Sequence, residues 1–481
     1  MKKIYQYVCL FLSVVAFSSC NDFLDVQPKG QLEENKMFDD MMGFEDAMFG
    51  IYAKMASGDL YGENLSWGMI DQIGQQFGYD NPQELTYHFN HYDYRNQQAR
   101  NVIDKVWAKQ YEAIAYINSV LVHLDQKSFA PQERKHMKGE CLGLRAFLHF
   151  DVARLFCNDY TRSNATTEGL PYATTFNLKN KEKHTLFETF QLILNDLNEA
   201  ETLLADDDNV SYDGTFQRDY SKGRVMLFNK YAVKATKARV YYAMGNYTEA
   251  ARCAREVIAA NQLFKLNSAS TIDAVMRFPA NKEMIFGVYN NTKGEAIRST
   301  FLRSTGMGSY TEARRDVKDL YETSTFSALS SDLRYSTFFR ENASGGTSSF
   351  SFVRLIQNDA EAKSTDALKG FVLISLPEMY YILAESVYDS NSTEAISLLN
   401  QVRKSRGLAA IASTRVDSKA KFVNEMLLER RREFPGMGQT FYALKHYNQS
   451  FTDFRNIDTY QPTNDIFNLP WPDREREYGN P

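Results

Sequence analysis

The sequence predicts a mainly α-helical protein: an irregular scaffold of paired helices with a loop-rich lobe and few short strands. Three observations predict this class. Several segments carry apolar residues at helical spacing and begin with residues that cap helices. One segment has the form of a helix, a tight glycine-containing turn and a second helix. Two long stretches lack any sustained period, and loops of that length are usually functional or disordered.

The N-terminal residues have the features of a lipoprotein leader. Two lysines precede a mostly apolar run over 4–17, which is shorter than the ~20 residues that a membrane-spanning helix needs. It fits a secretory signal peptide. Small residues then precede Cys20, an arrangement that resembles a bacterial lipobox, in which the cysteine is acylated and becomes the new N-terminus. We predict a signal peptide over 1–19 and a lipid on Cys20; the alternative is a secreted protein with an incidental cysteine.

Capping boxes predict where two helices begin. Thr185 with Glu188 opens the first, whose apolar residues recur at helical spacing. Ser375 with Glu378 opens the second, with a proline allowed in the first turn. A further helix then ends near Gly407, which is placed to terminate it. Other helices are expected over 106–124 and 143–156.

The segment over 230–260 is the most informative. Ala235 and Ala238 share one predicted helical face, and after Gly245 a second helix presents Ala251 and Ala254. Small residues at this spacing let two helices approach closely. The pair resembles a tetratricopeptide unit, but no strict repeat follows it. The scaffold is therefore predicted to be tetratricopeptide-like and irregular.

Composition excludes several classes of protein. The chain has 55 basic and 60 acidic residues, which are interspersed and give a net charge of −5, so no nucleic-acid partner is predicted. The cysteines after residue 20 (Cys141, Cys157 and Cys253) lack metal or redox spacing; they are expected to be buried thiols, and the alternative is that two of them form one disulfide. The seven histidines form no HExxH motif. We predict no cofactor, no catalytic metal and no catalytic residues.

Six stretches in order resemble the SusD/RagB family of nutrient-uptake outer-membrane lipoproteins from Bacteroidetes. They are CNDFLDVQPKG from Cys20, VWAKQYEAIAYIN, GLRAFLHFDVARLF, the Ala-rich pair at 232–260, NKEMIFGVY at 281–289, and the block of LPEMYYILAESVY, LLNQVRKSRGL and FVNEMLLERRREF. The resemblance covers essentially the whole mature chain and implies a SusD-like fold. It gives an N-terminal half over 20–262 and a C-terminal half over 263–481. The latter divides into a loop-rich part (263–370), a helical block (371–450) and a tail.

The resemblance also implies a function. Such a protein is held at the cell outer membrane by its lipid, facing the exterior. It captures oligosaccharide or polysaccharide and delivers it to a SusC-like TonB-dependent transporter, with no enzymatic step. Some relatives handle peptides, so a binder of peptides or other nutrients with the same partner is one alternative. A helical glycan-degrading enzyme is another; it would need a pair of catalytic carboxylates, and no motif indicates one.

A glycan site needs a flat aromatic platform and a few fixed polar groups. Both long loop segments, over 61–97 and 263–370, offer such residues. The candidate ligand-binding residues are Trp67, Asp71, Tyr79, Tyr92, Tyr94, Tyr289, Asn290 and Tyr310. For each of them the alternative is that the side chain only packs its own loop. Trp67 is the first candidate because it stands between Ser66 and Gly68, and its replacement by alanine is expected to weaken binding with little loss of stability.

Three charged clusters have simpler interpretations. The acidic turn 206–208 could hold calcium through oxygen ligands, but its spacing matches no known loop and a solvated turn is the alternative. The run from Glu429 to Glu433 is interpreted as ion pairs on a helix surface. Asp151 and Arg154 are expected to form a structural pair.

Overall fold

The structure is a computed structural model that describes residues 36–177, 182–211, 224–268, 282–302, 311–322, 332–344, 347–364 and 367–478. The predicted leader and Cys20 lie outside these ranges. By their contacts the described residues divide into two units, one that ends at residue 47 and one that begins at residue 48. In the first unit, the ring of Phe38 packs against that of Phe44 with 4.7 Å between centroids. The predicted division of the chain at residue 262 stays a prediction.

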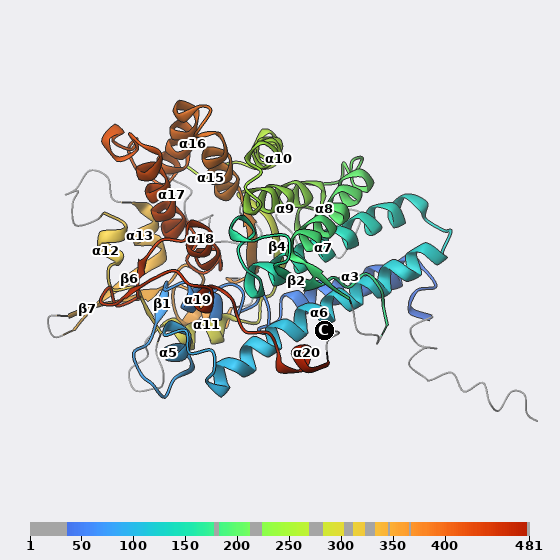
Figure 1. Cartoon of the computed structure of the whole chain (residues 1–481), viewed down its shortest axis with the longest axis horizontal. Helices are drawn as coiled ribbons and strands as arrows, with labels where there is room; N and C mark the ends of the chain where they lie inside the picture. Colours follow the sequence, from blue (N-terminus) through green and yellow to red (C-terminus); the bar gives the residue numbers. More distant parts are fainter. Residues whose placement is uncertain are drawn as a thin grey trace, which may run out of the picture. The chain divides into compact units, whose positions relative to one another are not determined.

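Helices dominate the described residues, so the mainly α class is confirmed (Figure 1). The α-helices are α3 (Met41–Met55), α4 (Met69–Ile73), α5 (Leu85–Asn90), α6 (Gln97–Gln126), α7 (Pro131–Phe156), α8 (Leu186–Leu203), α9 (Lys230–Ala243), α10 (Tyr247–Ala259), α11 (Gly294–Phe301), α12 (Val317–Leu320), α13 (Leu333–Phe338), α14 (Asp359–Lys363), α15 (Leu376–Val387), α16 (Ser392–Ser405), α17 (Lys419–Glu433), α18 (Thr440–Tyr447), α19 (Asn464–Phe467) and α20 (Asp473–Tyr478). Short 3-10 turns lie at Tyr160–Arg162, Arg224–Met226 and Ser413–Arg415.

The strands form two-stranded antiparallel pairs. The pairs are β1 (Phe77–Gly78) with β5 (Glu312–Ala313), β2 (Glu168–Pro171) with β3 (Lys183–Thr185), β4 (Met284–Tyr289) with β8 (Gly370–Ser375), β6 (Phe339–Ser344) with β7 (Thr347–Phe352), and β9 (Phe451–Thr452) with β10 (Thr459–Tyr460). The predicted stretch at 281–289 therefore contains a strand. The pair of β4 with β8, in which Val288 faces Phe371, joins segments that are distant in sequence. It connects the two ends of the loop-rich part.

The predicted helix starts are confirmed where they depend on neighbouring residues. Thr185 accepts a hydrogen bond from the Glu188 amide, and the Glu188 carboxylate accepts one from the Thr185 amide, so the capping box begins α8. Asn246 caps α10 with a single bond, in which its side chain accepts from the Glu249 amide. Gly245 before it has φ +72°, which only glycine adopts without strain. The helix, turn and helix predicted over 230–260 are thus confirmed as α9 and α10.

The second predicted capping box is wrong, although α15 does begin at Leu376. The Ser375 hydroxyl makes no cap hydrogen bond and has no partner among the residues described. Glu378 instead accepts a hydrogen bond of 2.8 Å from Arg239 Nε on α9. Because its carboxylate binds this distant arginine, Glu378 connects α15 to α9 and does not cap the first turn of α15.

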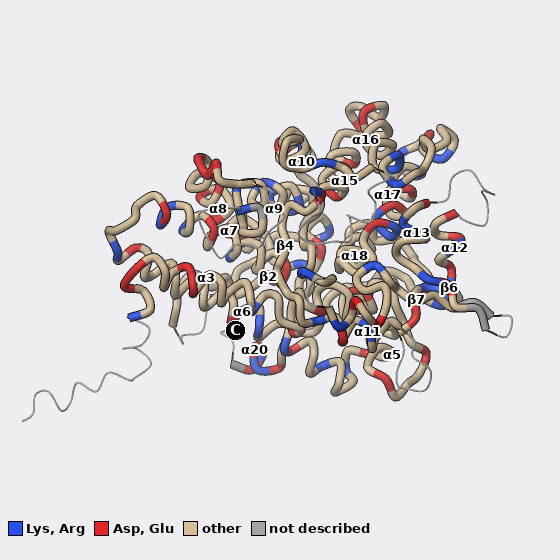
Figure 2. The backbone as a smooth tube through the Cα atoms, turned by 180° about the vertical axis from the view of Figure 1, so that it is seen from behind, with Lys and Arg blue, Asp and Glu red and all other residues tan. Residues whose placement is uncertain are grey.

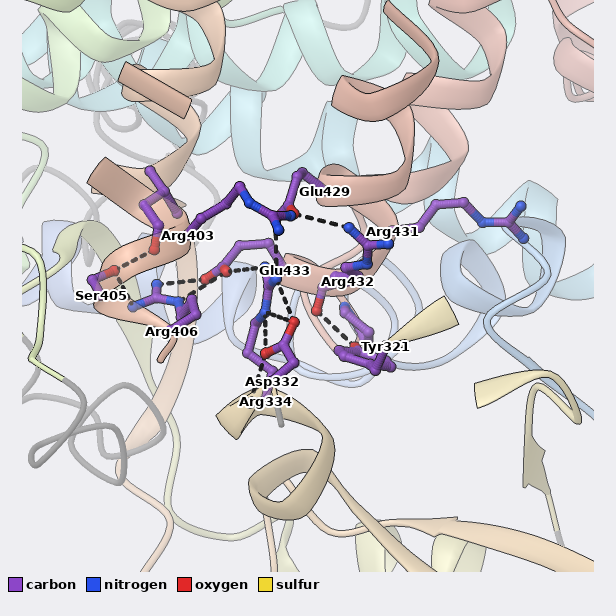
Figure 3. Close-up of polar contacts among 12 residues, drawn as sticks. Tyr321, Asp332, Arg334, Arg403, Ser405, Arg406, Glu429, Arg431, Arg432 and Glu433 are labelled. Carbon is purple, nitrogen blue, oxygen red and sulfur yellow. Dashed lines mark hydrogen bonds and ion pairs between the residues drawn. The ribbon is translucent and has the colours of Figure 1, made fainter. Parts of the chain in front are cut away.

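The run from Glu429 to Glu433 is also not a set of surface ion pairs. All five side chains are buried on α17, and Figure 3 shows carboxylates and guanidinium groups interleaved around them. Glu429 accepts hydrogen bonds from Arg403 at 2.7 Å, Arg432 at 2.9 Å and Arg334 at 3.0 Å. This cluster joins α17 to α16 and α13. We call it the Glu429 cluster.

Glu433 continues the Glu429 cluster toward the strands. It accepts hydrogen bonds from Arg334 and Arg406, and Arg406 in turn binds Glu283 beside β4 at 2.8 Å. The surrounding guanidinium groups hold the pKa values of Glu429 and Glu433 below their usual range, against the effect of burial. Because the partners come from four separate segments, the cluster is a tertiary contact and not a helix-surface feature.

The remaining expectations on cysteine and charge are met. Cys141, Cys157 and Cys253 are buried and unpaired, and Asp151 forms an ion pair with Arg154. Figure 2 shows acidic and basic residues interspersed along the described backbone. Among the residues that the structure describes, none of the helices combines the length and the apolar character that a bilayer span demands.

Candidate functional site

The first predicted loop, 61–97, is folded into the interior for much of its length, and the expectation that Trp67 faces a ligand is wrong. The Trp67 side chain is 2% exposed. Its indole nitrogen donates to the Gly62 carbonyl at 3.0 Å, and its ring meets the edge of Phe301 with 5.8 Å between centroids. Because the side chain is buried and its ring packs against Phe301, neither ring face is open to a sugar. Trp67 is therefore a core residue.

Asp71 is likewise buried, with no exposed surface. Its Oδ2 accepts a hydrogen bond of 2.6 Å from the Gly436 amide. Burial raises the pKa of Asp71 well above its usual range, although the Gly436 amide and Arg354 oppose that shift. The carboxylate therefore fixes the turn after α17, where Gly436 and Gly438 have positive φ, and is not available to a ligand.

Two other candidates, Tyr92 and Tyr94, line a groove of about 850 Å³. We call it the Tyr92 groove. One wall is the entry to α6, a second is the end of α7 with β2, and the third is the C-terminal tail with α19 and α20. The lining residues are Tyr92, Asp93, Tyr94, Arg95, Gln97, Arg100, Phe156, Cys157, Asn158, Thr167, Glu168, Asn464, Asp465, Asn468, Leu469, Pro470, Trp471, Asp473 and Arg476.

Tyr92 is held firmly at the groove. Its φ of +56° is left-handed, which costs a non-glycine residue about 1–3 kcal/mol and persists only where the surroundings fix it. Here the hydroxyl donates to the Ile73 carbonyl and accepts from Gln75 Nε2, both at 3.0 Å. The ring meets Tyr460 edge-on at 4.9 Å. Tyr92 is half-buried, so part of its surface is fixed in place and still accessible.

The tail wall is attached by buried aromatic residues. Tyr94 donates to the Ile466 carbonyl at 2.8 Å, and the Trp471 indole donates to the Phe156 carbonyl at 3.0 Å. Arg100 binds the Trp471 carbonyl and the Asp473 carboxylate. Tyr94 and Trp471 are therefore supports of the wall and offer little surface to a ligand.

The exposed part of the lining is polar and charged. Asp93, Arg95, Asp465 and Arg476 are all exposed, and the amides of Gln97 and Asn464 lie beside them. Such a set supplies both hydrogen-bond donors and acceptors. Next to one half-exposed tyrosine, it can hold a ligand that is rich in hydroxyl groups.

The other candidates lie apart from this groove. Tyr79 is half-buried, and its amide donates to Asn90 Oδ1 at 3.3 Å. Tyr289 ends β4. Asn290 donates to the Ala56 carbonyl at 2.7 Å and accepts from the Thr292 amide at 2.8 Å, so its side chain joins the turn after β4 to the distant segment after α3. Tyr310 lies outside the described residues.

The acidic turn is occupied by basic side chains. Asp206 accepts from Lys135 at 2.8 Å, buried Asp207 pairs with Arg224 at 2.8 Å, and Asp208 pairs with Lys230 at 3.0 Å. Each of the three carboxylates thus binds a different basic side chain, and together they do not form a calcium site. In the part of the chain that the structure describes, histidine, cysteine and acidic side chains form no group suited to a metal ion.

The C-terminal tail was not predicted to be a wall of the groove. The stretch over 464–476 combines one of the chain's three tryptophans with asparagines, prolines and charged residues. A Trp together with side-chain amides is a combination that could have indicated a binding surface in the tail. Its attachment to Tyr94 and Phe156, which lie far away in sequence, could not be read from local patterns.

Comparison with known proteins agrees with this architecture. A family profile described as "Starch-binding associating with outer membrane" matches residues 22–242, and the profile of the SusD family matches residues 300–478. Comparison with curated protein sequences gives no match.

Solved structures of the same fold cover most of the chain. A SusD superfamily protein from Bacteroides thetaiotaomicron is 19% identical with a TM-score of 0.72, over 91% of this chain and 97% of that one. A SusD-like carbohydrate binding protein from Bacteroides vulgatus is 18% identical with a TM-score of 0.71, over 91% and 96%. A SusD superfamily protein from Bacteroides fragilis is 18% identical with a TM-score of 0.67, over 89% and 95%. The chain belongs to the SusD/RagB family.

Proposed function

We propose that this protein is a glycan-binding lipoprotein that takes up an oligosaccharide or polysaccharide in the Tyr92 groove without cleaving it. The observation that carries the proposal is the groove itself. Its volume of about 850 Å³ lies within the range of about 300–1,000 Å³ typical of ligand sites. Its exposed donors and acceptors stand around a fixed tyrosine, which suits the hydroxyl rim and the apolar face of a sugar ring.

The family supports the same class of ligand and the location. One matching profile is described as starch-binding and as associating with the outer membrane, and a protein of the same fold is a carbohydrate binding protein. We infer that Cys20 carries the lipid that holds the chain at the outer membrane, facing the exterior. The bound glycan is then handed to a SusC-like TonB-dependent transporter. Two acyl chains suffice for stable anchoring, whereas one gives marginal binding.

A screen of the chain lacking residues 1–19 against an array of glycans tests the ligand class, with a peptide set in parallel. We expect at least one oligosaccharide or polysaccharide to bind and no reducing ends to appear after prolonged incubation. Binding of peptides alone would replace the glycan by a peptide ligand. Turnover of any bound glycan would contradict the non-enzymatic assignment.

Two arginines of α20 form a matched pair that tests the groove. Arg476 lines the groove, whereas Arg474 on the same helix does not, and both are exposed. Arg476→Ala should weaken the affinity for the glycan found in the screen by about 10- to 150-fold, because a hydrogen bond to a charged group contributes about 1.5–3 kcal/mol. Arg474→Ala should leave the affinity unchanged. Both variants should unfold within about 0.5 kcal/mol of the parent.

Titration calorimetry of the two variants and of Arg95→Ala, which tests the opposite wall, gives the affinities. Equal affinity in Arg476→Ala, Arg95→Ala and the parent protein would place the glycan elsewhere on the chain.

A further inference from the structure

Gln75, in the turn between α4 and β1, has a backbone conformation that glutamine rarely adopts. Its φ is +56°, in the left-handed region, and the residue has no exposed surface. Tyr92 has the same φ, and the side chains of these two residues are hydrogen-bonded to each other. Conformations of this kind persist only where the surrounding contacts fix them, and they cluster at functional sites. A direct bond between two such residues beside the Tyr92 groove therefore points to a role in shaping the groove.

The side-chain amide of Gln75 makes three hydrogen bonds, all to other segments. Its Nε2 donates to the Asn90 carbonyl at 2.8 Å and to the Tyr92 hydroxyl at 3.0 Å, which uses both of its hydrogens. Its Oε1 accepts from the Phe454 amide at 3.1 Å. Phe454 lies in the hairpin of β9 and β10, so one buried amide joins this hairpin to the loop that carries Tyr92.

The hairpin contacts Tyr92 directly through Tyr460. The Tyr460 hydroxyl donates at 3.2 Å to the Asn90 carbonyl, which Gln75 also binds. The Tyr460 ring meets the Tyr92 ring edge-on, with 4.9 Å between centroids. Tyr92 is thus held at its hydroxyl by Gln75 and at its ring by Tyr460, and Gln75 binds both segments that carry these two rings.

Gln75 is itself fixed from the opposite side. Its carbonyl accepts from Nη1 of Arg314 at 2.8 Å. Arg314 is 2% exposed and binds the Asp316 carboxylate through two bonds of 2.7 Å. Its Nη2 also donates to Thr452 of β9 at 3.1 Å. The backbone of Gln75 is therefore anchored by a buried ion pair, and its side chain has a fixed point from which to hold Tyr92.

We propose that Gln75 is a positioning residue of the Tyr92 groove: it holds Tyr92 in the left-handed conformation against the hairpin, and glycan affinity depends on it although it touches no ligand. This inference rests on the proposed function. Without the donors of Gln75, Tyr92 is free to relax to an ordinary backbone conformation. The affinity then falls by the fraction of molecules that keep the conformation needed for binding.

The next residue, Gln76, supplies a matched control. It is 2% exposed, and its Nε2 also donates two hydrogen bonds, to the Arg431 carbonyl at 2.9 Å and to Thr440 at 2.7 Å. It therefore serves α17 and α18 and not the groove. Gln75→Met and Gln76→Met each keep the length of the side chain and remove two buried donors, so both should lower the melting temperature. Only Gln75→Met should weaken the affinity for the glycan from the screen, by about tenfold.

Hydrogen exchange followed by mass spectrometry tests the positioning without any glycan. The Tyr92 amide donates to the Phe89 carbonyl at 3.1 Å and is protected by this bond. Peptides that contain Tyr92 should exchange faster in Gln75→Met than in the parent, and at the rate of the parent in Gln76→Met. Unchanged exchange in Gln75→Met, or equal acceleration in both variants, would overturn the proposal.

Calorimetric affinities separate a failure of this inference from a failure of the proposed function. If Arg476→Ala weakens glycan binding and Gln75→Met does not, the groove binds the glycan and the positioning role is refuted. If neither variant weakens binding, the glycan lies elsewhere and both proposals fail.

A double variant tests whether Gln75 acts through Tyr92. Tyr92→Ala alone and Tyr92→Ala combined with Gln75→Met should bind the glycan equally, because the first change already removes the group that Gln75 holds. A further, additive loss of affinity would contradict the positioning role. If Gln75→Met does not fold, Tyr92→Phe decides, since it removes only the hydroxyl that Gln75 binds. Its affinity should fall by about 2- to 12-fold, and an affinity equal to that of the parent would overturn the proposal.

Discussion

Replacing Glu429 by glutamine should lower the free energy of unfolding by about 3–5 kcal/mol, because it breaks a buried ion cluster from one side. Because glutamine has the shape of glutamate, the loss of stability reports the removal of the negative charge alone. It leaves Arg334, Arg403 and Arg432 facing a neutral amide in the interior, where each had bound a carboxylate oxygen at 2.7–3.0 Å. Urea unfolding followed by circular dichroism measures the difference.

The matched control is Glu295→Gln, which removes an exposed glutamate that pairs with Arg298 three residues later. It should change the stability by less than about 0.5 kcal/mol. The pH dependence gives a second readout. Since the folded pKa of Glu429 is lowered, its contribution is present above the unfolded value of about 4.3 and is lost as pH falls below it. A Glu429→Gln variant as stable as the control would mean that the Glu429 cluster adds nothing to the fold.

Replacing Trp67 by alanine should cost about 3–5 kcal/mol, the range for truncating a large buried aromatic side chain. The cavity would lie against Phe301, and the indole hydrogen bond to the Gly62 carbonyl would be lost. Affinity for the glycan, measured well below the unfolding transition, should stay within about twofold of the parent. This is the opposite of what a surface platform at Trp67 would give.

Phe176→Ala is the control for the loss of a ring, because Phe176 is 46% exposed. Its effect on the free energy of unfolding should be within about 0.5 kcal/mol. If Trp67→Ala kept the stability of the parent and lost glycan binding, the side chain would have to be a ligand contact after all.

Local sequence predicted the features that local interactions build. The cap at Thr185, the turn at Gly245 and the pairing of α9 with α10 all depend on residues within a few positions of one another, so pattern and spacing were enough. The same holds for the mainly α class. The order of the stretches that resemble the SusD/RagB family predicted the fold of the whole chain.

Prediction failed where a residue's partner is distant in the chain. Glu378 was predicted to cap the start of its own helix, α15, but it forms an ion pair with Arg239 of α9. Glu429 and Glu433 were predicted to form ion pairs with neighbours on the surface of α17. They are buried instead, and they form ion pairs with Arg334 and Arg406. Trp67 was assigned to the surface because its sequence neighbours are small, whereas Phe301 packs against it. In each case the local pattern was compatible with two environments, and a tertiary contact decided between them.

The candidate site was predicted in part for the same reason. Tyr92 and Tyr94 were identified as aromatic residues of a loop, and both line the groove. The opposite wall comes from the tail, whose contact with the loop spans most of the chain. The role of Tyr92 as a ligand contact, like that of Tyr79, Tyr289, Asn290 and Tyr310, stays a prediction.

The most direct test of the account is a crystal structure of the chain lacking residues 1–19 with the glycan that the screen selects. We predict that the sugar occupies the space between Tyr92 and the tail, within hydrogen-bond distance of Arg95 or Arg476. A glycan bound with full occupancy at another surface, with the Tyr92 groove empty, would contradict it.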